Sequence, residues 1–275
     1  MKRLLALSLL AMSLPALPAC SGERGGALAA SGQPTIVSLN PCTDAILAEI
    51  TGPDQLLAIS HYSKDPNSSS MAAENAARFN ATGGTVEEVL ALDPDIVVAS
   101  TFIAPATRAA LVDLGIRVET FGGVGSAEES IEQIRKLASV AGNPAAGEAL
   151  AARIEAALGT AAMSGTKLEA ALWQPGGIVP GEGALVSDLL RRTGFTSYSL
   201  SRGMAQADYL SLEQVVSDPP DVLLVAGSEA GQQHPALEAV PQMRRETFDP
   251  GLLYCGGPTI IRASQRLAQI RQAAS

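Results

Sequence analysis

The sequence predicts an α/β protein of two lobes, each with a mostly parallel β-sheet flanked by helices, bridged by one long α-helix. Two observations lead to this fold class. Short β-branched runs alternate with amphipathic stretches along most of the chain, which is typical of βαβ units. The alternation stops once, at an Ala-rich stretch without a strand pattern, and then resumes. The 275 residues, 47% of them apolar, are enough for two hydrophobic cores.

The N-terminal lobe is predicted over residues 34–140. Its first strand, TIVSL, precedes a helix and a second apolar strand, and the alternation continues as far as RVETF. At Pro94 the X-Pro step ends one helix before the next strand begins. The expected strands cover 35–39, 55–60, 95–100 and 117–121, and the expected helices cover 42–50, 85–92 and 106–114.

The bridging helix is predicted over residues 141–164 and the C-terminal lobe over residues 165–275. Asn143 can cap the bridging helix, and Pro144 fits its first turn. In the C-terminal lobe the expected strands cover 167–173 and 221–226, and the expected helices cover 184–194, 211–217 and 259–272.

An internal repeat indicates that the two lobes are related. The segment VEEVLALDPDIVVA at 86–99 aligns without gaps with LEQVVSDPPDVLLV at 212–225. Glu87 falls on Glu213, and in both copies a short helix ends at an X-Pro step before a buried strand. Chance recurrence of a common helix–turn–strand unit is the alternative, which the shared glutamate disfavours.

Residues 1–20 are predicted to be a signal peptide with a lipobox. A basic start precedes the apolar core LLALSLLAMSL, which is shorter than the roughly 20 residues of a membrane-spanning helix. LPAC then resembles a bacterial lipobox with Cys20 as the lipidated residue; ordinary signal cleavage is the alternative, which Leu17 fits badly. Residues 21–33 are rich in Gly, Ser and Ala and are expected to form a flexible tether. We expect a periplasmic protein, or a lipoprotein anchored to the membrane and facing the periplasm or exterior.

Charge and cysteine content narrow the function classes. A net charge of −9 argues against nonspecific nucleic-acid binding, which needs a basic face. Cys42 and Cys255 remain after Cys20, and an exported pair can form a disulfide. Their predicted placement in different lobes, where a covalent link would close a cleft that must open, favours two buried thiols.

Aromatic and polar side chains follow the predicted strands. The segment LLAISHYSKDP starts as a strand and breaks into His61, Tyr62 and Ser63. Strand exits are where α/β proteins usually bind ligands. Three further aromatics, at predicted exits or loops, are Phe102, Trp173 and Tyr209. Such side chains suit a flat, mostly apolar ligand with a polar rim, although core filling is the alternative for each.

These segments resemble the periplasmic substrate-binding proteins of ABC importers for cobalamin, haem and ferric siderophores, and most closely the cobalamin-binding members. The resemblance covers about residues 34–271, and Ser60 to Ser63 followed by Pro66 is its most specific part. It implies that a monomer captures a metal-containing macrocycle between the lobes and delivers it to a membrane permease dimer. Cobalamin or a related corrinoid is the first expectation, and haem or a ferric siderophore the second.

Histidine content limits metal chemistry. Cobalamin-binding relatives tend to have a small residue where this chain has His61, so the resemblance does not make this histidine a ligand. An imidazole can bind cobalt or iron, but a solvated loop histidine is favoured. The other histidine is His234, and two histidines are too few for the related zinc and manganese receptors.

The repeated glutamates have a separate expected role. In relatives, one glutamate at the tip of each lobe pairs with arginine on a membrane subunit, and Glu87 and Glu213 match these positions. Stabilisation of a helix N-terminus by a carboxylate is the alternative.

Two segments depart from the family pattern. PCTDA places Asp44 and Ala45 where relatives often have Thr-Glu, and Thr259 follows Pro258 where they often have arginine. No nucleophile elbow, zinc-protease or P-loop motif is present, so an enzyme is not expected. An exported enzyme and a structural lipoprotein are the alternatives of another class.

Overall fold

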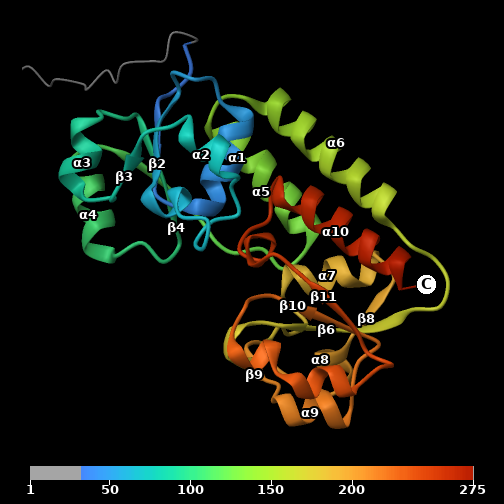
Figure 1. The fold of residues 1–275 in the computed structure, drawn as a ribbon. Coiled ribbons are helices and arrows are strands. Elements are labelled where there is room, and N and C mark those ends of the chain that lie inside the picture. Colours follow the sequence, from blue (N-terminus) through green and yellow to red (C-terminus); the bar gives the residue numbers. More distant parts are fainter. Residues whose placement is uncertain (1–31, 275) are drawn as a thin grey trace, which may run out of the picture.

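The computed structural model describes residues 32–274 and shows two α/β lobes joined along one side by helices (Figure 1). The predicted signal peptide, its lipobox at Cys20 and nearly all of the tether lie outside the described residues. Within the described part, none of the helices has the length and apolar character needed to cross a membrane.

The N-terminal lobe contains a five-stranded parallel sheet in the order β3-β2-β1-β4-β5. The central strand β1 is buried along its whole length, and its neighbour β4 is buried except at its last residue, Ser100, which explains their largely apolar sequences. The strands are β1 (Ile36–Ser38), β2 (Leu56–Ser60), β3 (Ala81–Thr82), β4 (Ile96–Ser100) and β5 (Arg117–Phe121). The helices are α1 (Pro41–Ile50), α2 (Ala73–Ala77), α3 (Val86–Ala91), α4 (Pro105–Asp113) and α5 (Ala127–Val140).

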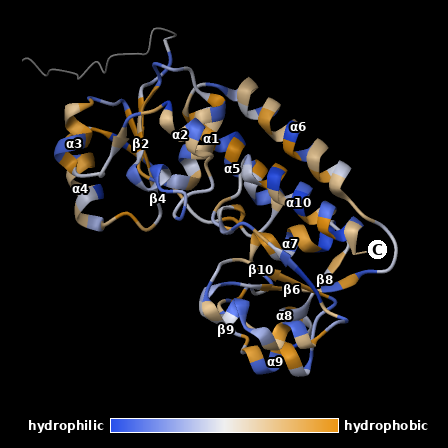
Figure 2. Cartoon of the chain, viewed as in Figure 1, coloured by the Kyte–Doolittle hydropathy of each residue, from blue (hydrophilic) through white to orange (hydrophobic). Residues whose placement is uncertain are grey.

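The C-terminal lobe contains a four-stranded parallel sheet in the order β11-β10-β6-β8 and a small antiparallel pair, β7 and β9. Hydrophobic residues gather on β6 and β10 at its centre (Figure 2). The strands are β6 (Leu168–Trp173), β7 (Ile178–Val179), β8 (Phe195–Ser197), β9 (Asp208–Tyr209), β10 (Val222–Val225) and β11 (Arg244–Thr247). The helices are α7 (Leu185–Arg192), α8 (Tyr198–Ser201), α9 (Leu212–Ser217) and α10 (Thr259–Ala273).

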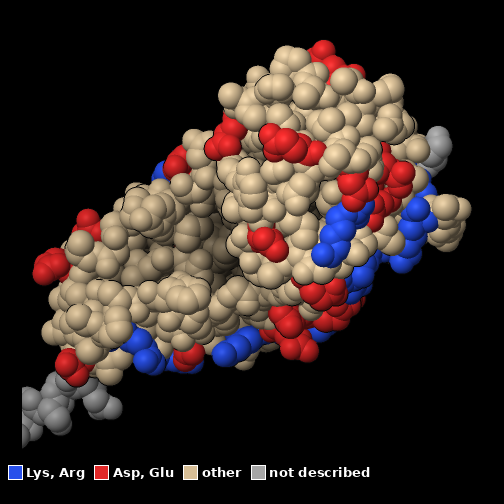
Figure 3. All heavy atoms as spheres, turned by 90° about the horizontal axis from the view of Figure 1, so that it is seen from below, with Lys and Arg blue, Asp and Glu red and all other residues tan. Residues whose placement is uncertain are grey.

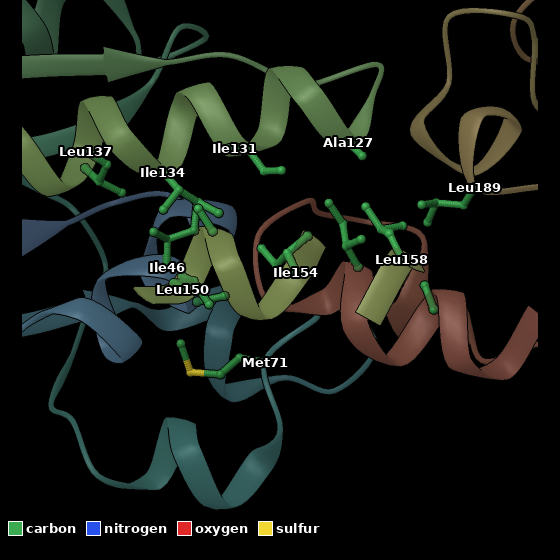
Figure 4. Packing of buried hydrophobic residues seen from close by; sticks show 14 of the residues in the cluster. Ile46, Met71, Ala127, Ile131, Ile134, Leu137, Leu150, Ile154, Leu158 and Leu189 are labelled. Atoms are coloured by element: carbon green, nitrogen blue, oxygen red, sulfur yellow. The ribbon is translucent and has the colours of Figure 1, made fainter. Parts of the chain in front are cut away.

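The predicted bridging helix is α6 (Pro144–Ala161), with Asn143 at its N-cap position. It does not stand alone, because α5 and α10 pack along it. Figure 4 shows Ile154 and Leu158 of α6 among buried side chains of α1, α5 and α7. The same buried cluster extends from Ile36 in the first sheet to Leu224 in the second. The two lobes therefore share one continuous core.

The repeated segments occupy equivalent places in the two lobes. Residues 86–99 form α3 and β4, and residues 212–225 form α9 and β10. At the start of each strand an aspartate accepts a backbone N–H from the neighbouring strand region: Asp95 from Thr35 and Asp221 from Glu169, both at 2.7 Å. The repeat is therefore present in the structure as well as in the sequence.

The expectation that Cys42 and Cys255 are unpaired thiols is wrong. They form a disulfide, with their Cα atoms 5.1 Å apart. The expectation failed because residues 249–258, which we call the strap, carry the chain from β11 back to the N-terminal lobe before α10 begins. Gly257 in the strap donates its N–H to Ser130 Oγ of α5 at 2.8 Å. The bond thus lies where the strap already contacts α1 and α5, and it leaves the lobes free to form a cleft.

Replacing both Cys42 and Cys255 with serine should lower the free energy of unfolding by about 2–4 kcal/mol, because the unfolded chain is then no longer cross-linked over a long loop. Urea unfolding followed by circular dichroism measures this, and wild-type protein treated with dithiothreitol should behave like the variant. An unchanged unfolding midpoint in the variant would show that packing of the strap alone supplies the constraint.

Candidate functional site

Of the cavities that the described residues form, two lie between the strand exits of the two lobes and have the strap on one side. The first has a volume of about 450 Å³ and the second of about 490 Å³. Leu253 and Tyr254 of the strap line both of them. Figure 3 shows a hollow between the lobes whose visible walls are formed by residues other than Lys, Arg, Asp and Glu. We call the two cavities together the cleft.

The cleft lies at the strand exits of both sheets, where parallel α/β proteins bind ligands. From the N-terminal lobe, the loop after β5 contributes Gly122 to Gly125, and the loop after β2 contributes Pro66 and Asn67. From the C-terminal lobe, Gln174 follows β6 and Ala226 follows β10. The sheet topology therefore brings loops that are distant in the sequence to one surface.

The lining of the cleft is poor in charge and has no cation. None of the described residues that line the two cavities is Lys or Arg, whereas Glu229 and Asp249 line the second cavity. Each carboxylate already accepts a backbone hydrogen bond: Glu229 from Gly176 N at 2.7 Å and Asp249 from Gly251 N at 2.8 Å. The other polar groups of the lining are the backbone of glycine-rich loops, side-chain amides such as those of Gln133 and Gln206, and the hydroxyls of Ser228 and Tyr254.

Tyr254 is the aromatic residue that the sequence analysis missed. Its side chain is 45% exposed in the strap, next to the disulfide, and it lines both cavities. No strand pattern precedes it, so the criterion of aromatics at strand exits could not identify it. The available signal was its place beside Cys255 in the glycine-containing segment LLYCGGP, which could only be used if the disulfide was known.

The structure places His61 and Tyr62 at the exit of β2, in the short 3₁₀ helix η1 (His61–Lys64). Their ring centroids are 4.0 Å apart, and His61 Nδ1 lies 3.3 Å from the carbonyl oxygen of Thr82. Tyr62 is 54% exposed. Neither ring is among the residues that line the two cavities, although Pro66 and Asn67 of the same loop are.

Phe102 also follows a strand exit, that of β4, and its side chain is 90% exposed. Its backbone N–H donates to Ser100 Oγ at 3.1 Å, which fixes the turn after the strand. It lies outside the lining of the two cavities. A ligand larger than these cavities could reach such an exposed ring, and its role stays a prediction.

Ser63 and Trp173 point away from the cleft, contrary to the expectation that they face a ligand. Ser63 is buried and donates its hydroxyl to Asp44 Oδ2 at 2.6 Å. Trp173 is 3% exposed, and its indole N–H donates to the carbonyl of Leu210 at 2.9 Å within the core of the C-terminal lobe. Because side chains alternate along a strand, Trp173 points into this core while the next residue, Gln174, lines the cleft.

Tyr209 is exposed but lies within the C-terminal lobe. It pairs with Ile178 in the β7–β9 ladder and lines a separate cavity of about 360 Å³ beside Arg202. A Cβ atom at Gly177 would approach Tyr209 Cε2 to 2.6 Å, so the ring rests on this glycine. The expectation that Tyr209 faces the same site as Tyr62 has no support in this placement.

Glu87 and Glu213 are exposed at the second positions of α3 and α9. Thr85 and Ser211 cap the two helices in the same way. Hydrogen bonds from its own backbone N–H and from Ser211 lower the pKa of Glu213, with a smaller contribution from nearby His234. The two helices lie on the outer parts of their lobes, away from the shared helical side (Figure 1).

The sequence profile of the periplasmic binding protein family matches residues 36–247, which include both sheets. The chain belongs to this family. No curated protein sequence matches the chain. The family assignment agrees with the resemblance described above and with the two parallel sheets.

Solved structures share the fold at low sequence identity. The periplasmic haem-binding protein RhuT of Roseiflexus sp. RS-1, in its apo form, is 21% identical, with a TM-score of 0.67 over 88% of this chain and 98% of its own. The vitamin B12-binding protein BtuF of Vibrio cholerae is 18% identical, with a TM-score of 0.66 over the same shares of the two chains, 88% and 98%. The haem-binding protein HutB of Vibrio cholerae is 16% identical, with a TM-score of 0.69 over 86% and 98%. At these identities the likeness concerns the fold.

Proposed function

We propose that this chain is the extracytoplasmic substrate-binding component of an ABC importer, and that it captures cobalamin or a related corrinoid in the cleft. Membership of a family of binding proteins supports a role in binding and not in catalysis. The observation that carries the choice of ligand is the cleft lining, which has carboxylates and amides but no Lys or Arg among its described residues.

Charge distinguishes the candidate ligands. A haem carries two propionates, and a ferric catecholate siderophore carries several negative charges. Placing such anions beside Glu229 and Asp249 would remove water from like charges without a compensating cation, which is unfavourable. A corrinoid has an amide rim, and in cyanocobalamin the single phosphodiester charge is balanced at cobalt. The amide groups of a corrinoid can donate hydrogen bonds to, and accept them from, the glutamines and backbone groups of this lining.

Tyr254 supports the same ligand class. An exposed phenol ring between two cavities provides an apolar face for a flat macrocycle and a hydroxyl for its rim. Tyr62 and Phe102 are exposed at the exits of β2 and β4 and could contact parts of the ligand that extend beyond the cleft. His61 is assigned no metal in this proposal, because its ring lies outside the lining of both cavities.

Delivery would occur through the lobe tips. Glu87 and Glu213 are exposed, equivalent in sequence and structure, and separate from the cleft lining, which supports docking onto a two-fold permease with basic residues. We further propose that the protein is exported, acts as a monomer and is attached to the membrane through a lipid at Cys20.

Calorimetric titration of the purified protein with cyanocobalamin, haemin and a ferric catecholate siderophore tests the ligand class. Cyanocobalamin should bind most tightly, because the lining offers hydrogen bonds without a net positive charge. Replacing Tyr254 with alanine should weaken this binding by about 0.5–1.5 kcal/mol through lost ring contact, which is roughly 2- to 12-fold in Kd. Tyr209→Ala is the matched control and should leave affinity unchanged. Tight binding of haemin with no binding of cyanocobalamin would reject the corrinoid assignment.

Reversing the charges of Glu87 and Glu213 tests docking without requiring the ligand class to be right. Glu87→Arg and Glu213→Arg should each slow association with the permease, and the double variant more so, with the largest deficit at low ionic strength. Surface plasmon resonance on the purified permease measures this rate, and Glu74→Arg on the N-terminal lobe provides a control with the same charge change. Normal association of the double variant would exclude docking through these tips.

A further inference from the structure

A fully buried carboxyl group holds both ends of the loop that carries His61 and Tyr62. Asp44 lies in the first turn of α1 and is 0% exposed. Its Oδ2 accepts the backbone N–H of Ser60 at 2.9 Å and the hydroxyl of Ser63 at 2.6 Å. These two residues flank His61 and Tyr62 in the sequence. The carboxyl group is therefore the anchor of this loop on the N-terminal lobe.

The second oxygen of this carboxyl group, Oδ1, is buried and has no hydrogen-bond partner. Nearby, the hydroxyls of Ser38 and Thr43 bond to each other at 3.0 Å. An ionised carboxylate with an unpartnered buried oxygen is costly, and the group gains by holding a proton. Burial raises the pKa of Asp44 to about 7, whereas the nearby Ser38 hydroxyl and the hydrogen bonds from Ser63 and Ser60 act in the opposite direction.

Charged groups on the elements packed against α1 do not compensate Asp44. These elements are β1, β2, η1, α5 and α6, and β1 and β2 carry no charged residue. The side chains in ion pairs on α1, α5 and α6 are Glu49, Glu128, Arg135, Glu148, Arg153 and Glu155. The other titratable side chains on η1 and α5 are His61, Tyr62, Lys64, Glu129, Glu132 and Lys136. All of these side chains are exposed, whereas Asp44 is buried.

We propose that Asp44 is a positioning residue that keeps the Ser60–Ser63 loop closed while its carboxyl group is neutral. Ionisation would place a charge with an unpartnered oxygen in a buried site, and hydration of that charge would open the loop over it and weaken ligand capture. The cost of this buried charge must exceed the gain from stronger Ser60 and Ser63 hydrogen bonds to the carboxylate. The part that concerns ligand capture depends on the proposed function of the cleft, which the loop adjoins through Pro66 and Asn67. The part that concerns the loop depends only on the contacts of Asp44.

The direction of the pH dependence follows from linkage. The closed loop binds the proton more tightly than a loosened, hydrated loop, in which Asp44 would titrate near its ordinary value of 3.8. The closed state is therefore most favoured below about pH 3.8. Its stability relative to the open state falls as the pH rises from there to about 7, and it does not change further above pH 7. A single linked proton limits the effect to about tenfold per pH unit.

Amide hydrogen exchange tests the loop without any ligand. Corrected for the intrinsic rate, the protection of Ser60 N–H in the wild type should fall by up to about tenfold per pH unit between about pH 4 and 7 and then level off. In Asp44→Asn, which keeps an acceptor oxygen but cannot ionise, protection should be independent of pH. Both are compared in a His61→Gln background, which removes the imidazole from the loop, and amides of β4 serve as the internal reference.

The same pH dependence of Ser60 protection in wild type and Asp44→Asn would overturn the proposal. If Asp44→Asn does not fold, Ser63→Ala replaces it: losing one of the two anchors should lower Ser60 protection at pH 5 by several-fold, and unchanged protection would overturn the proposal.

Affinity for cyanocobalamin provides the second measurement. Between pH 5 and 7 the Kd of the wild type should rise several-fold and then level off, whereas that of Asp44→Asn should stay constant. Parallel pH profiles in the two proteins would reject the link to ligand capture even if the exchange result holds. Absence of cyanocobalamin binding at every pH would instead reject the proposed ligand, while hydrogen exchange would still decide the role of Asp44.

Discussion

The return of the chain through the strap is the constraint on which the rest of the structure depends. Residues 249–258 leave the second sheet, contact α1 and α5, and are fixed to α1 by the bond between Cys42 and Cys255. The chain then continues as α10 along α6, so that both lobes share one core. This arrangement gives the cleft a fixed side that carries Tyr254, while the strand exits of the two lobes form its walls. A fixed side and preformed cavities favour binding with little rearrangement.

The chemistry of the cleft follows from which side chains the fold places in its lining. The arginines in the described chain are largely engaged in ion pairs and backbone contacts on the outer surface and along α10, as for Arg153, Arg202 and Arg266. The cleft lining receives glycines, amides and two carboxylates. A ligand that brings its own amide rim suits such a surface better than one that brings carboxylates, because buried anions need cations as partners.

Much of the fold could be predicted from the sequence, since β1, β4 and β10 are largely buried parallel strands with apolar runs, and β6 becomes buried and apolar from Ala170 on. The edge strand β11 could not, because RRET is polar and largely exposed and pairs only through its backbone. Local patterns also could not show that Trp173 points inward, or that the strap returns to α1. Both features depend on tertiary packing. The return of the strap to α1 brings Cys255 next to Cys42 and places Tyr254 at the cleft.

The most direct test of the account is a crystal structure of the protein with cyanocobalamin. We expect the corrin ring to lie against Tyr254 between the two cavities, with the disulfide intact, the relative orientation of the lobes unchanged and no cationic side chain in contact with the ligand. A corrin ring bound outside the cleft, or a rotation of the lobes that moves the strap away from α1, would contradict the account.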